Sequence, residues 1–76
     1  MPYKTDEELP DRVKKNLPPH AQHIYREAYN HAYQQYKDPE ERRDPSDDLE
    51  AVAARVAWSA VKDEYHKENG KWVRNR

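Results

Sequence analysis

Two long stretches of the chain repeat apolar residues at steps of three and four, the spacing that places side chains on one face of an α-helix. The first stretch covers about residues 19–36, and its stripe consists of Ala21, Ile24, Tyr25, Ala28, Ala32 and Tyr36. The second stripe is more regular and consists of Leu49, Val52, Ala53, Val56, Ala57, Ala60, Val61 and Tyr65. We therefore predict two long amphipathic helices that face each other across one core. The lowest exposure is expected at Ile24, Ala28, Ala32, Val52, Val56, Ala60, and Trp58 or Tyr65.

Prolines, a glycine and a capping residue predict where these helices begin and end. Pro10 opens a short helix over residues 11–17, and Pro18-Pro19 stops it and starts the first long helix. Asp47 is the expected N-cap of the second long helix, because Glu50 follows three residues later in a capping box. Gly70 is expected to stop that helix or to form the turn just after it. It is the only glycine in the sequence, which disfavours an all-β fold rich in tight turns.

The two ends of the chain carry short segments that favour a strand. Residues 71–74 alternate polar and apolar side chains, and residues 3–5 are the expected partner strand. The predicted fold is therefore mainly α, with three helices, one short and two long, and a small two-stranded sheet that joins the termini. We expect one domain over residues 1–76, with residues 37–48 as a charged, flexible loop within it.

Composition limits the functions that the chain can have. Fourteen Lys and Arg face fifteen Asp and Glu, cysteine is absent, and no apolar run is long enough for a signal peptide or a membrane span. A monomeric cytoplasmic protein is expected. Ser46 and Ser59 lack a neighbouring base, and there is no glycine-rich phosphate loop, so no enzyme activity is expected. The balanced charge also disfavours nucleic-acid binding, although the basic C-terminal segment keeps that alternative open.

Two groups of side chains could bind cations. The acidic loop offers oxygen ligands suited to weak binding of Ca²⁺ or Mg²⁺, although it lacks the spacing of an EF-hand. Its carboxylates belong to Asp38, Glu40, Glu41, Asp44, Asp47 and Asp48. The second group is His20, His23, Glu27 and His31 on the first long helix. His23 and His31 lie about 12 Å apart along the helix axis, so we interpret that group mainly as a solvated polar face. No tightly bound cofactor is expected.

A protein partner is the expected ligand of such a chain. Tyr29 and Tyr33 lie at the flank of the first stripe and are expected to be exposed close to Arg26. Tyrosine and arginine are enriched where proteins bind each other, so these three residues are the candidate partner-binding site.

The whole chain resembles the ChaB family of small bacterial proteins labelled cation transport regulators. The resemblance rests on segments that agree in order and spacing along the chain. In the first half they are Met1 to Lys4, Leu9-Pro10, Leu17 to Gln22, Ile24-Tyr25 and Glu27-Ala28. In the second half they are Gln35 to Asp38, Arg42-Arg43, Val56 to Trp58, Ala60 to Lys62, Glu64-Tyr65 and Trp72. It implies a three-helix unit with a small sheet and cyclin-box-like packing. It also implies a regulatory role on a sodium/calcium–proton antiporter, and it carries over no catalytic residues.

Overall fold

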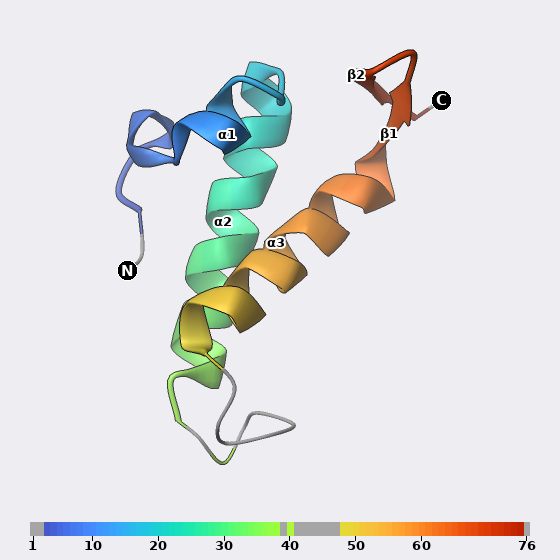
Figure 1. Cartoon of the computed structure of the whole chain (residues 1–76). Helices are drawn as coiled ribbons and strands as arrows, with labels where there is room; N and C mark the ends of the chain where they lie inside the picture. Colours follow the sequence, from blue (N-terminus) through green and yellow to red (C-terminus); the bar gives the residue numbers. More distant parts are fainter. Residues whose placement is uncertain (1–2, 39, 41–47, 76) are drawn as a thin grey trace.

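The computed structural model describes residues 3–38, 40 and 48–75, which form a helical pair closed by a C-terminal hairpin. The elements in chain order are a 3₁₀ turn η1 (Asp6–Glu8), α1 (Asp11–Lys14), α2 (Pro19–Tyr36), α3 (Leu49–Glu64), β1 (Tyr65–Glu68) and β2 (Lys71–Arg74). In Figure 1, α2 and α3 make the body, α1 lies beside the start of α2, and the strands follow the far end of α3. The prediction of a mainly helical protein, with three helices and one two-stranded sheet, is confirmed.

Local capping interactions account for the helix ends. Pro18 is the N-cap of α2 and Pro19 its first residue, as predicted. The Gln22 side-chain amide donates to the Leu17 carbonyl oxygen at 2.8 Å and thereby ties α2 to the segment after α1. The N-cap of α3 is Asp48, whose carboxylate accepts from the Glu50 backbone N–H at 3.1 Å. The N-cap predicted from the sequence, Asp47, is therefore one residue too early, and it lies outside the described residues.

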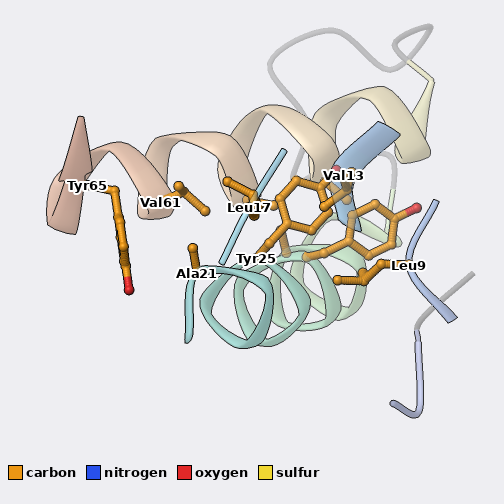
Figure 2. Packing of buried hydrophobic residues seen from close by; sticks show 11 residues of the cluster. Leu9, Val13, Leu17, Ala21, Tyr25, Val61 and Tyr65 are labelled. Atoms are coloured by element: carbon orange, nitrogen blue, oxygen red, sulfur yellow. The ribbon is translucent and has the colours of Figure 1, made fainter. Parts of the chain in front are cut away.

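The core lies between α2 and α3 and is covered on one side by the N-terminal segment. Figure 2 shows the buried side chains in a row between the two helices, from Tyr65 at one end to Leu9 at the other. The fully covered residues of α2 and α3 include four alanines, Ala21, Ala32, Ala53 and Ala57, together with the larger Tyr25 and Val61. Small side chains let two helix backbones approach closely, so larger side chains flank the contact and fill the space around it.

The predicted buried faces were rotated slightly from the real ones. Ala32, Val52 and Tyr65 are buried as expected, whereas Ile24, Ala28, Val56, Trp58 and Ala60 are only half-buried. Tyr25, a member of the predicted stripe, is buried as expected, whereas Tyr29, which was expected at the exposed flank, is buried as well. The reason is that Leu9, Val13 and Leu17 from the N-terminal segment join the same core, which covers a side of α2 that α3 does not reach.

Alanine substitutions at two valines of α3 test this rotation. Val61 is fully covered and Val56 is half-buried, although both belong to the stripe seen in the sequence. Val61→Ala is expected to lower the free energy of unfolding by about 2–3 kcal/mol, from lost apolar burial and the cavity left behind. Val56→Ala, the matched control, is expected to cost less than half as much. Urea unfolding measures both values, and equal losses would contradict the orientation of α3.

The strand pairing differs from the prediction. β1 pairs with β2 in an antiparallel register that sets Tyr65 opposite Arg74 and Glu68 opposite Lys71. The strands are joined by Asn69 and Gly70, which have φ values of 54° and 81°. Positive φ at both central residues is the geometry of a type I′ hairpin turn, for which Asn-Gly is strongly preferred. Gly70 therefore lies in a turn, which is one of its two expected roles, although this turn joins two strands and does not follow the helix, because α3 already ends at Glu64.

The predicted pairing of residues 71–74 with residues 3–5 is wrong. The backbone of Tyr3 is bound by the side chain of Asn30 on α2 instead. The Tyr3 N–H donates to Asn30 Oδ1 at 2.8 Å, and Asn30 Nδ2 donates to the Tyr3 carbonyl oxygen at 2.7 Å. One amide side chain thus satisfies both backbone groups that a strand partner would have satisfied. The N-terminal segment and the hairpin consequently lie on opposite sides of α2 (Figure 1).

The turn residues give a direct test of the hairpin. Gly70→Ala is expected to lower the free energy of unfolding by about 1–2 kcal/mol, because a Cβ disfavours the left-handed backbone at this position. For a domain of this size the melting temperature should fall by roughly 4–8 °C per kcal/mol. The control is Asn69→Gly, which keeps a residue suited to positive φ and should have little effect. Thermal unfolding distinguishes the two, and a tolerated Gly70→Ala would contradict the turn type.

Candidate partner-binding surface

Two tryptophans and a lysine form a half-exposed surface where the hairpin meets α3. The Trp58 and Trp72 rings stack with their centroids 5.8 Å apart and their planes at 28°. Both are half-buried, so each ring rests on the core and keeps part of its area in solvent. The register sets Lys67 opposite Trp72, and the Lys67 ammonium lies 5.9 Å from the centre of the Trp72 ring. We call Trp58, Lys67 and Trp72 the tryptophan surface.

The core holds this surface in place from below. The Trp58 ring meets the ring of buried Tyr25 edge-on, with centroids 5.2 Å apart and an interplanar angle of 74°. Tyr65, the first residue of β1, is buried, and its hydroxyl hydrogen-bonds with His20 Nδ1 at the start of α2 over 2.9 Å. The hairpin is therefore anchored at its root to both long helices. An aromatic surface on such a support loses little conformational entropy on binding.

The three residues predicted to bind a partner do not form an exposed patch. Tyr29 is only 4 % exposed, so the expectation that it lies at the surface is wrong. Its burial, with the neighbouring Tyr3 as a further cause, raises the pKa of the Tyr29 hydroxyl. Tyr33 is half-buried and stacks on Tyr29 with centroids 6.2 Å apart. Arg26 is 18 % exposed, and its Nε donates to Asp6 Oδ1 at 2.6 Å, so it holds the N-terminal segment on α2.

The histidines of α2 are dispersed. His23 Nε2 lies 3.7 Å from Glu27 Oε1, whereas His20 turns towards Tyr65 and His31 is exposed further along the helix. Within residues 3–38, 40 and 48–75, no three His, Cys, Asp or Glu side chains are placed to hold one metal ion.

The acidic loop is only partly within the described residues. Asp38 and Asp48 each accept a hydrogen bond from the backbone N–H two residues later, at Glu40 and Glu50. These carboxylates therefore serve as local caps of the chain. The other predicted ligands Glu41, Asp44 and Asp47 lie outside the described residues.

Sequence reasoning missed the tryptophan surface, although its signal was present. Asn69-Gly70 stands between two four-residue runs, residues 65–68 and 71–74, and an Asn-Gly pair between short strands is a strong hairpin signal. Reading it would have set Lys67 opposite Trp72. The contact of Trp72 with Trp58 depends on how the hairpin folds back on α3, which local sequence does not encode.

Among the described residues, no helix is both long enough and apolar enough to cross a lipid bilayer.

These features define a class of small helical domain in which two packed helices are closed by a C-terminal hairpin. Residues 9–75 match the family model described as ChaB, and the chain therefore belongs to the ChaB family. It is 56% identical over 73 residues to the Escherichia coli K12 protein named "Putative cation transport regulator ChaB", with 95% of each chain covered. A Shigella flexneri protein of the same name matches with the same identity and coverage.

A solved relative has the same fold. The solution NMR structure titled as that of the "putative cation transport regulator ChaB" superimposes with a TM-score of 0.80 at 53% sequence identity. The match covers 99% of this chain and 100% of the other. The structural agreement thus extends through the helices and the hairpin together.

Proposed function

We propose that this chain regulates a cation transporter by binding a protein partner. The observation that carries the proposal is the 56% identity to relatives named as cation transport regulators, over 95% of both chains. The partner suggested by the family resemblance is a membrane cation–proton antiporter, which this chain would meet from the cytoplasm.

The tryptophan surface is the docking face in this proposal. Tryptophan is enriched at the energetic centres of protein interfaces, where a large ring can be desolvated without immobilising many torsions. Trp58 and Trp72 are already stacked and keep area in solvent, and Lys67 adds a cation at their edge. This face replaces the predicted site at Arg26, Tyr29 and Tyr33, because Tyr29 is buried and Arg26 already holds Asp6.

The electrostatics favour a protein over a nucleic acid. Affinity for a phosphate backbone comes mainly from Lys and Arg that neutralise phosphates, and the net charge here is −1. The cations of the hairpin are also interleaved with acids, since Lys71 lies opposite Glu68. A protein partner with an acidic rim fits this mixture better than a duplex does.

Recovery of the chain on antiporter-containing membranes tests the proposal. The wild-type chain should be retained at 150 mM salt, and Lys67→Glu should reduce its retention by about tenfold, which corresponds to about 1.4 kcal/mol. Lys4→Glu is the matched control, because it makes the same charge reversal on the exposed N-terminal segment across α2 from the hairpin. Trp72→Ala, with its fold checked by circular dichroism, should reduce retention at least as much.

Two results would contradict the proposal. One is equal loss of retention in Lys4→Glu and Lys67→Glu, which would mean that only overall charge matters. The other is submicromolar binding to duplex or single-stranded DNA at the same salt concentration, with no retention on the membranes.

We also propose that the acidic segment 37–48 binds Ca²⁺ or Mg²⁺ weakly. Six carboxylates occur between Asp38 and Asp48, and hard cations prefer such oxygen ligands. The segment lacks the sequence spacing of an EF-hand, so the dissociation constant should be about millimolar. NMR titration with CaCl₂ measures this value against NaCl of equal ionic strength. A micromolar site of defined stoichiometry would contradict the prediction, and shifts confined to His23, Glu27 and His31 would move the site to α2.

A further inference from the structure

The His66 ring in β1 faces hydrogen-bond acceptors on both sides. His66 Nδ1 lies 2.6 Å from Asn75 Oδ1, and His66 Nε2 lies 3.1 Å from Glu68 Oε2. Glu68 is two residues along the same strand, so its side chain lies on the same face of the hairpin as His66. Asn75 directly follows β2, and the ring therefore bridges the two strands at the open end of the hairpin.

The orientation of the Asn75 amide follows from its other contacts. Asn75 Nδ2 donates to the Asp63 carbonyl oxygen at 3.2 Å, and the Asn75 backbone N–H donates to the Glu64 carbonyl oxygen at 2.8 Å. A carbonyl only accepts, so the amide nitrogen has to face Asp63 and the amide oxygen has to face His66. Asn75 thus caps two carbonyls in the last turn of α3, where intrahelical donors are lacking.

Both ring nitrogens of His66 must then donate. The Asn75 oxygen and the ionised Glu68 carboxylate are acceptors, and a neutral imidazole has only one N–H. Only the imidazolium makes both contacts at once. A positive charge just beyond the C-terminus of α3 is also favoured by the helix dipole.

Charged groups of both signs surround the His66 ring, and its direct hydrogen bonds have the largest effect on its pKa. Glu68 on β1 favours the imidazolium, whereas Lys71 and Arg74 on β2, which line the same surface hollow, oppose it. From α3, Asp63 and Glu64 reach the clasp through their backbone carbonyls. The hydrogen bond to Asn75, followed by the one to Glu68, raises the pKa of His66 above its ordinary value.

We infer that His66, Glu68 and Asn75 form a proton-dependent clasp that closes the end of the C-terminal hairpin onto the last turn of α3. Protonated His66 holds both acceptors, and neutral His66 releases one of them. Because the folded-state pKa is raised, the stabilisation is fully present below the unfolded pKa of about 6.5. It is lost as pH rises through the folded-state pKa. The clasp does not rest on the proposed function, although it sits on the hairpin that carries Lys67 and Trp72.

An NMR titration of the His66 ring tests the clasp through two variants with opposite expected effects. Asn75→Asp places a carboxylate at Nδ1 and should raise the His66 pKa further, whereas Glu68→Gln removes the charge at Nε2 and should lower it. His31→Gln, an exposed histidine change on α2, should leave the His66 pKa unchanged. Shifts of opposite sign are expected because one variant adds a carboxylate next to the ring and the other removes one. A wild-type His66 pKa at or below 6.5, or shifts of the same sign in both variants, would overturn the inference.

Hydrogen exchange provides the second readout. The Asn75 amide, which donates to Glu64, should lose protection relative to its intrinsic exchange rate as pH rises through the His66 pKa. In His66→Gln this pH dependence should disappear, because glutamine does not titrate. The amide of Val61 inside α3 serves as the internal reference. Unchanged pH dependence of Asn75 protection in His66→Gln would also overturn the inference.

Discussion

The close contact between α2 and α3 is the interaction on which the rest of the structure depends. Four alanines, Ala21, Ala32, Ala53 and Ala57, are fully covered on the two helices, and small side chains at such positions let two helices pack closely. Larger buried side chains, Tyr25 and Val61 among them, complete the core around these alanines. Leu9, Val13 and Leu17 join Tyr25 and Tyr29 in this core, and the Trp58 ring packs against both Tyr25 and Trp72. A small domain has little stability in reserve, and here both ends of the chain are used to complete one core.

Much of the fold could be predicted because it is encoded in local periodicity. The start of α2 follows from Pro18-Pro19, and the regular stripe of α3 predicts a helix whatever its surroundings. The rotation of each helix could not be read from the stripe, since Ile24 and Tyr25 both belong to it and only the neighbours decide which is buried deeper. Those neighbours include Leu9 and Val13, whose docking is a long-range event.

The candidate site was harder to predict than the fold for the same reason. Tyr29 looks like an exposed flank residue on an isolated helix, but Tyr3 crosses over it, with ring centroids 4.9 Å apart, once Asn30 holds the Tyr3 backbone. Arg26 is a residue type that is common in interfaces, but its guanidinium forms an ion pair with Asp6 within the same chain. The tryptophan surface combines three consecutive elements, α3, β1 and β2, and only the pairing of the two strands has a local sequence signal. Membership of the family, in contrast, followed from the order and spacing of residues along almost the whole chain.

The pairing of β1 with β2, the next strand in the chain, also affects the rate of folding. A sheet between the two termini would close a loop of about 65 residues, at an entropic cost roughly 3 kcal/mol greater than that of a two-residue turn. With Asn69-Gly70 as the turn, the hairpin depends on contacts between adjacent residues and can form on a microsecond timescale. The hydrogen bonds of the helices also join residues that are close in sequence. The long-range contacts of the fold are therefore mainly contacts between side chains. Chains of low contact order fold quickly, and this one should spend little time with its aromatic residues exposed during synthesis.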